Sequence, residues 1–120
     1  MDKFNIFYYN GKKTIYELSI YKLHEGKAPF DKWFSSLKDK KTRLIIQSRI
    51  DRAVFGNFGD IKSLGDDIFE FRIIFGPGYR VYFSIQDQKI LLLLIGGDKR
   101  TQYKDIAKAK LYLKDWRENV

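Results

Sequence analysis

The chain has 120 residues and contains no cysteine, one methionine, two prolines and a single histidine, His24. Without cysteine there are no disulfides, no thiol catalysis and no cysteine-ligated zinc, and one histidine cannot supply a two-histidine catalytic pair. The longest unbroken apolar run, residues 90–95, is too short to span a bilayer. Residues 1–5 lack the basic and apolar segments of an export signal, so we expect a cytoplasmic protein without a membrane partner.

Repeats, low-complexity tracts and linkers rich in Pro, Gly or Ser are also missing, which predicts one domain over residues 1–120. Apolar residues make up 44% of the chain, enough surface for one core without covalent crosslinks. Positive charge is abundant, because 23 Lys and Arg against 15 Asp and Glu leave a net charge of +8. This balance favours a polyanionic partner, which would be a nucleic acid, a ribosome or an acidic protein.

The first half of the chain has the pattern of a strand followed by two helices. Aromatic and β-branched residues predict a strand over about residues 14–21, and Asn10-Gly11 indicates a turn after a short partner strand. Pro29 suits a first helical turn, and the next apolar residues have helical spacing. The apolar stripes expected on the first helix and on a second helix from about residue 39 to 56 are Phe30, Trp33, Phe34 and Leu37, then Ile46, Ile50, Ala53 and Val54.

The second half changes to strand periodicity. Alternating apolar residues predict two half-exposed strands, over residues 69–75 and 79–85. Residues 90–95 are apolar throughout, which is typical of a strand covered on both faces. Helical spacing returns over residues 101–117, where Trp116, like Trp33 earlier, is expected in the core. The predicted order is β-α-α-β-β-β-α, an α+β fold.

A glycine turn, Gly76-Pro77-Gly78, separates the two alternating strands. Both apolar sets must face the core, and a three-residue loop achieves this by placing Phe75 opposite Tyr79. A common polar face, which we expect to be open to solvent, then carries Arg72, Arg80 and Tyr82. In the alternative interpretation the arginines belong to an ordinary solvated surface, paired with Glu70 and Asp67.

Six stretches of the chain together match a known pattern: residues 29–34, 56–65, 69–73, 76–83, 91–94 and 96–102. They resemble the RelE/ParE toxin superfamily, and within it the HigB-like, phage-derived branch of addiction module killer proteins. The resemblance extends over about residues 14–115. It implies a RelE-like microbial RNase fold, with a twisted, mainly antiparallel sheet, two N-terminal helices and a C-terminal helix.

The resemblance also implies a function: the toxin of a type II toxin–antitoxin system, an endoribonuclease that cleaves mRNA on the ribosome and inhibits translation. The implied partners are the ribosome, mRNA and a helix-turn-helix antitoxin that forms a hetero-oligomer with the otherwise monomeric toxin. No cofactor or metal is implied. The positions that match the family's active-site residues are Arg72, Arg80, Lys99 and Tyr103.

The implied reaction is attack of a ribose 2′-OH on its own 3′ phosphate. Arg72 and Arg80 suit the phosphate, because guanidinium groups are permanently charged and bind two oxygens at once. Residues 96–103 contain no histidine, so the candidate proton acceptors are Lys99, Tyr82 and Tyr103, whose deprotonation clustered cations would favour. Basic residues expected to bind RNA are Lys41, Arg43, Arg49, Arg52 and Arg100.

Two other functions fit the same resemblance. A ParE-like inhibitor of DNA gyrase shares the fold but has no nuclease site, and the basic residues at positions 72, 80 and 99 argue against it. A non-catalytic module would only pair with the antitoxin. Fold alone cannot separate these functions, because function depends on the residues of the site.

Overall fold

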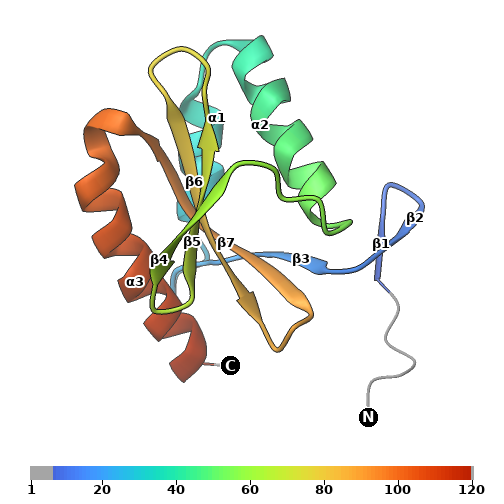
Figure 1. Ribbon diagram of the computed structural model, residues 1–120. Helices are drawn as coiled ribbons and strands as arrows, with labels where there is room; N and C mark the ends of the chain where they lie inside the picture. Colours follow the sequence, from blue (N-terminus) through green and yellow to red (C-terminus); the bar gives the residue numbers. More distant parts are fainter. Residues whose placement is uncertain (1–6, 120) are drawn as a thin grey trace.

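Five strands form one mixed sheet in the order β3-β7-β6-β5-β4 (Figure 1) in the computed structural model, which describes residues 7–119. β3 runs parallel to β7, and the other three pairings are antiparallel. A separate hairpin pairs β1 with β2 through a turn at Asn10 and Gly11, both with positive φ. The strands are β1 (Phe7–Tyr9), β2 (Lys12–Thr14), β3 (Glu17–Ile20), β4 (Ile61–Gly65), β5 (Ile68–Ile73), β6 (Tyr79–Gln86) and β7 (Ile90–Asp98).

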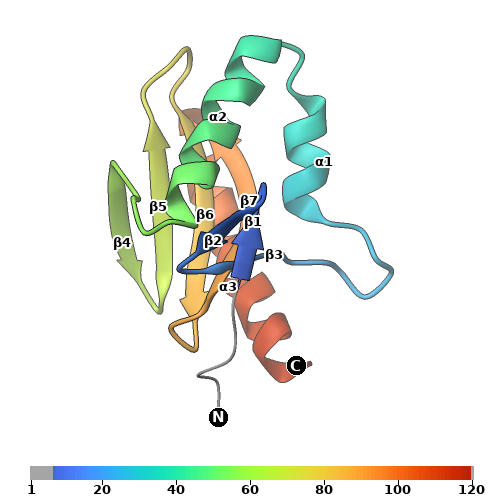
Figure 2. The same ribbon diagram turned by 90° about the vertical axis from the view of Figure 1, so that its right-hand side faces the viewer.

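Helices cover both faces of this sheet, as the two views in Figures 1 and 2 show. α1 (Pro29–Ser36) and α2 (Lys40–Ala53) lie on one face, and α3 (Gln102–Glu118) lies on the other, after the short 3₁₀ helix η1 (Lys99–Thr101). Pro29 occupies the first turn of α1, where its missing N–H costs no hydrogen bond. Asp39 caps α2 by accepting a hydrogen bond from the Lys41 N–H at 3.2 Å.

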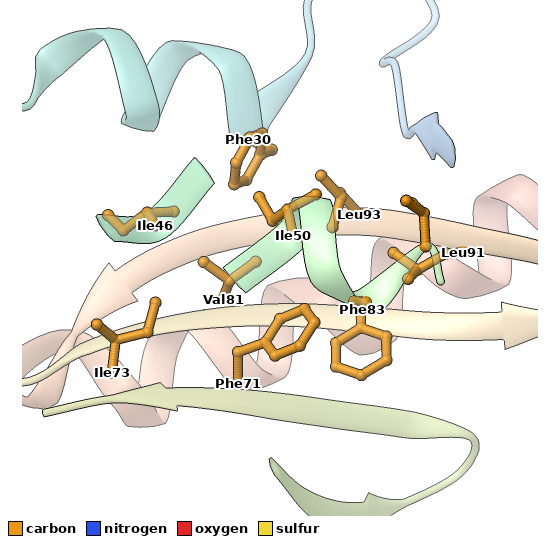
Figure 3. Close-up of a cluster of buried hydrophobic side chains, with 11 residues drawn as sticks. Phe30, Ile46, Ile50, Phe71, Ile73, Val81, Phe83, Leu91 and Leu93 are labelled. Carbon is orange, nitrogen blue, oxygen red and sulfur yellow. The ribbon is translucent and has the colours of Figure 1, made fainter. Parts of the chain in front are cut away.

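Each face of the sheet has its own apolar cluster. Beneath α1 and α2, the cluster includes Phe30, Ile46 and Ile50 from the helices and Phe71 and Phe83 from the strands (Figure 3). On the α3 side, Tyr82, Leu92 and Leu94 pack with Ala109 and Leu113. The prediction that residues 90–95 form a strand covered on both faces is therefore confirmed. Trp33 and Trp116 are partly buried against these two clusters.

The α+β class is confirmed, but two expectations about its strands are wrong. The predicted order left out β4, whose sequence Ile-Lys-Ser-Leu-Gly does not alternate, and β1 and β2 form a small sheet of their own. The strands β5 and β6 are not half-exposed. Residues 81–84 are all buried, because α3 packs on the face that the polar residues of β6 share.

The predicted hairpin register is wrong by two residues. Ile73 pairs with Tyr79 and Arg72 pairs with Arg80, so the loop between β5 and β6 has five residues, 74–78. Phe75 leaves the strand because the loop closes on its own backbone, where the Gly78 N–H donates to the Phe75 carbonyl at 3.2 Å. A shift of two residues preserves the alternation, so the side of the sheet on which each residue lies was predicted correctly.

Two glycines of β7 allow both helix layers to approach the sheet. A Cβ at Gly96 would lie 2.2 Å from the Trp33 ring of α1, and one at Gly97 would lie 1.8 Å from the Asp105 carboxylate of α3. Just before them, a bulge makes Leu94 an extra residue, because Phe83 pairs with Leu93 whereas Tyr82 pairs with Ile95.

No helix within residues 7–119 is long and apolar enough to cross a membrane. The expectation that the chain starts without an export signal rests on residues 1–5, which lie outside the described residues.

Candidate functional site

Arg72 and Arg80 are directly opposite each other on β5 and β6, and therefore project from the same face of the sheet. Their environments differ. The Arg72 side chain is 41% exposed and donates to Asp60 Oδ1 from Nε at 3.2 Å and from Nη2 at 2.9 Å. The Arg80 side chain is only 15% exposed, and its Nε lies 3.6 Å from Oε2 of the fully buried Glu70. The two arginines thus share one face of the sheet, Arg72 at the surface and Arg80 beneath it, and each has a carboxylate neighbour.

Polar groups surround Arg80 beneath the first turn of α3. Gln102 of α3 donates from Nε2 to Glu70 Oε2 at 2.8 Å, and Glu70 in turn is the cross-strand partner of Tyr82. Three buried atoms in this cluster have no hydrogen-bond partner within the described residues: Glu70 Oε1, Arg80 Nε and Tyr82 Oη. These three atoms lie together around the Glu70 carboxylate, which is the shared neighbour of Arg80 and Tyr82.

Tyr82 does not fit the role of proton acceptor that its position in the sequence suggested. Its side chain is fully buried beneath α3. Burial raises the pKa of Tyr82 well above its usual value, and the nearby Glu70 carboxylate raises that pKa further. The phenolate is therefore disfavoured, and the hydroxyl cannot reach a substrate. The expectation that Tyr82 faces solvent is wrong because α3 covers it.

Lys99 and Tyr103 lie on the surface where β7 leads into α3. Lys99 is exposed, and its Cβ lies 3.8 Å from where a Cβ of Gly78 would be, which places it beside the β5–β6 loop. Tyr103 is 91% exposed in the first turn of α3. Arg100 is 82% exposed at its side chain and pairs with Asp98 at 2.9 Å, which lowers the pKa of Asp98. The β5–β6 loop and the start of α3 lie at the same end of the molecule (Figure 1).

The four residues of α2 that were expected to bind RNA do not join this surface, because α2 packs on the opposite face of the sheet. Lys41 lies 5.6 Å from the Phe75 ring centre and Arg43 donates to the Leu37 carbonyl, while Arg52 is exposed. Arg49 has a structural role in which its guanidinium donates to three backbone carbonyls. These carbonyls, 2.9 to 3.1 Å away, belong to Arg72, Phe58 and Asp60.

Two partners of the site were missed in the sequence. Asp60 precedes β4, a strand with no readable pattern, so nothing placed its carboxylate next to Arg72. Gln102 reaches Glu70 only because α3 crosses back over the sheet, a contact between positions 32 residues apart. Glu70 itself could be found, because its alternation with Arg72 puts it on the same face. Within residues 7–119, no three His, Cys, Asp or Glu side chains group as they would to hold a metal ion.

Comparison with known proteins gives one relative and no function. No protein-family model matches the chain. A protein of Haemophilus influenzae (strain KW20 Rd), described only as uncharacterized, is 56% identical over 82 residues. The aligned part covers 68% of this chain and 83% of that protein. With this identity and coverage, the chain belongs to the same family as the uncharacterized H. influenzae protein.

Proposed function

We propose that the chain is a RelE-like, HigB-type toxin that cleaves mRNA at the ribosome in the cytoplasm and is held inactive by a helix-turn-helix antitoxin. The observation that carries this proposal is the cross-strand pair of Arg72 and Arg80 on one face of the sheet. Guanidinium groups on neighbouring strands can offer paired N–H donors to a phosphodiester, whose two free oxygens accept them. A ParE-like gyrase inhibitor needs no such pair.

In the proposed reaction, the ribose 2′ oxygen attacks phosphorus while the bond from phosphorus to the 5′ oxygen breaks. Arg72 meets the incoming phosphate at the surface, and Arg80 stabilises the extra negative charge of the crowded phosphorus from below. Lys99 in η1 and Tyr103 in the first turn of α3 are the remaining proton-transfer groups. Lys99 accepts the 2′ proton in its neutral form and Tyr103 donates to the leaving 5′ oxygen. The products carry a 2′,3′-cyclic phosphate and a 5′-OH.

The proposal is tested by brief expression of the chain in growing bacteria, followed by mapping of new RNA ends. We expect new 5′-OH ends within translated codons and arrested growth. Lys99→Ala should lower cleavage about 100-fold or more, the usual contribution of a positioned base or acid. Lys114→Ala is the matched control, since it removes the same charge from an exposed position on α3 outside the site. Intact mRNA with the unmodified chain would refute the nuclease.

Variants of the arginines need different designs because their burial differs. Arg72→Ala should preserve the fold, since an exposed ion pair contributes only about 0–1 kcal/mol. Arg80→Ala would leave the buried Glu70 charge unpaired, which is strongly destabilising. Glu70→Gln combined with Arg80→Gln removes both charges together and separates loss of cleavage from loss of fold. Both designs should abolish cleavage while circular dichroism spectra stay unchanged.

A non-catalytic antitoxin-binding module is the second candidate, and one observation favours it. Both guanidinium groups already have carboxylate neighbours, Asp60 for Arg72 and Glu70 for Arg80. If those pairs persist in the complex with RNA, phosphate binding is weak. In that case the chain would bind the product of a neighbouring helix-turn-helix gene, and its expression alone would neither cut RNA nor trap gyrase on DNA.

A further inference from the structure

Strand β7 is longer than the neighbour on its outer side. β3 pairs with β7 only from Glu17 opposite Ile90 to Ile20 opposite Leu93. Within residues 7–119, the last backbone hydrogen bond on that side runs from the Tyr21 N–H to the Leu93 carbonyl, at 2.9 Å. Beyond it, β7 continues to Asp98 with β6 as its sheet neighbour on the other side. Within the described residues, therefore, no strand continues β3 alongside residues 94–98 of β7.

The chain turns away from this position instead of filling it. After Tyr21 a tight turn forms, in which the Leu23 N–H donates to the Lys27 carbonyl at 2.7 Å and the Gly26 N–H to the Leu23 carbonyl at 2.8 Å. The chain then enters α1 at Pro29. Figure 1 shows β3 and the upper part of β7 diverging from each other.

A groove of about 520 Å³ lies along the open edge of β7. Its floor includes the side chain of Ile95 and the backbone of Gly96 and Gly97, two residues without side chains to block the edge. Trp33 of α1 forms one wall and Tyr112 of α3 forms the other. The groove is thus a slot in the plane of the sheet, with a helix above and a helix below.

The rim of the slot is positively charged. Lys27, Lys32 and Lys108 line it, and all three are exposed. The acidic residues in the lining already have partners within the chain. Asp98 pairs with Arg100, and Asp105 accepts a hydrogen bond from the Thr101 hydroxyl at 2.5 Å. A ligand that enters the slot therefore meets apolar walls, the open backbone edge at Gly96 and a cationic border, while the Asp98 N–H at the end of the edge donates to the Thr101 hydroxyl at 3.2 Å.

We propose that this slot binds an extended acidic peptide of a partner protein, which adds a short strand to the edge of β7. Only a peptide backbone offers N–H and C=O groups at the spacing that an open strand edge presents. Four residues of strand span about 13 Å, the length of edge left by residues 94–97, since the Asp98 N–H and carbonyl are bonded to the Thr101 hydroxyl. Alternate side chains of the peptide contact Trp33 and Tyr112, and its carboxylates pair with the rim lysines.

This inference does not rest on the proposed nuclease. Arg80 lies on β6, across β7 from the slot, so a peptide could occupy the slot with the arginine pair left open. A nucleotide is the competing occupant, because aromatic walls and lysines also suit a base and a phosphate.

The experiment presents a phage-displayed library of seven-residue peptides to the full chain, and then titrates an enriched peptide into ¹⁵N-labelled protein. We expect enriched sequences to alternate apolar residues and to carry Asp or Glu. Their binding should shift the amide signals of residues 94–98 and slow hydrogen exchange at Gly96, whose N–H faces the open edge, more than at Gly97, whose N–H faces β6. The variant Lys32→Glu with Lys108→Glu should bind at least about tenfold more weakly, because it reverses the rim charge.

The matched control is Lys12→Glu with Lys13→Glu, which makes the same charge change on the distant β1–β2 hairpin and should alter affinity less than about twofold. Three results would overturn the proposal. They are no enrichment from the library, enriched peptides that leave the amides of 94–98 unchanged, and AMP or GMP shifting those amides when the peptides do not.

Discussion

Tyr82 is the residue whose interpretation changes most when its surroundings are known. Its buried hydroxyl makes no hydrogen bond of ordinary geometry within the described residues, although it interacts with the Glu70 carboxylate, so replacing it with hydrogen removes mainly a desolvation cost. We expect Tyr82→Phe to leave RNA cleavage unchanged and to leave the free energy of unfolding equal or raised by up to about 1 kcal/mol. Urea denaturation measures the second effect. A loss of more than about 1 kcal/mol would mean that the hydroxyl is bonded in solution.

Tyr9 gives a prediction about pH. Burial raises its pKa to about 12, and the hydrogen bond at 2.6 Å to the Asp51 carboxylate raises it as well. A pKa raised by folding means a stabilisation that is complete below the ordinary value of about 10 and disappears as the pH rises towards 12. Unfolding free energy should fall over this window, and less steeply in Tyr9→Phe. Equal slopes for the two proteins in alkaline denaturation would contradict the assignment.

The arginine pair marks what the sequence could and could not predict about single residues. Alternation along β5 and β6 was enough to put Arg72 and Arg80 on one face, because register errors of two residues do not change sides. Their exposure could not be predicted in the same way. It depends on Asp60 and Gln102, which approach from distant parts of the chain.

Among the secondary-structure elements, β7 has the tightest contacts with both helix layers. Because a Cβ at Gly96 would overlap the Trp33 ring, we expect Gly96→Ala to destabilise the fold by about 1–3 kcal/mol. Replacing Trp33 with Leu in the same chain should recover part of that loss, which a double-mutant cycle measures as coupling. Strictly additive effects would show that α1 yields to the added methyl group at no cost.

Elements with a strong periodic pattern were predicted best. The apolar stripes expected from residue 30 and from residue 46 lie on α1 and α2, and the last helix covers nearly the expected range. β4 was missed because two polar residues, two apolar residues and a glycine give no period. The face that α3 covers was missed for another reason: helical spacing shows that a helix has an apolar side, but not which surface receives it.

The net charge of +8 belongs to the molecule as a whole and predicts how RNA binding depends on salt. Each phosphate contact to single-stranded RNA contributes about −0.7 to the slope of log affinity against log salt concentration. Arg72→Ala should therefore weaken binding and make the slope about 0.7 less steep, whereas Lys114→Ala should leave the slope unchanged. Fluorescence titrations of a labelled oligonucleotide at several salt concentrations measure both slopes. Identical slopes for all three proteins would mean that Arg72 contacts no phosphate.

The layered architecture gives the molecule a second apolar cluster that its composition did not predict. Composition indicated one basic domain with a single core, and the structure has two apolar clusters separated by the sheet. Their separation follows from β7, whose residues alternate between the clusters. The proposed RNA surface and the peptide slot lie on opposite sides of this strand, at the end where it leads into α3.

The extra residue Leu94 has a consequence for how relatives of this chain are aligned. Leu94 interrupts the alternation, so Leu94 and Ile95 both belong to the α3-side cluster. Every later residue of β7 therefore lies on the side opposite to the one that strict alternation along the sequence would predict. A relative shorter by one residue here would lack the bulge, and its counterparts of Gly96 and Gly97 would keep their sides, because each would stay opposite the same residue of β6. A bulge-free relative should therefore be aligned with a gap at this column, since an alignment without the gap would assign the residues after it to the wrong helix layer.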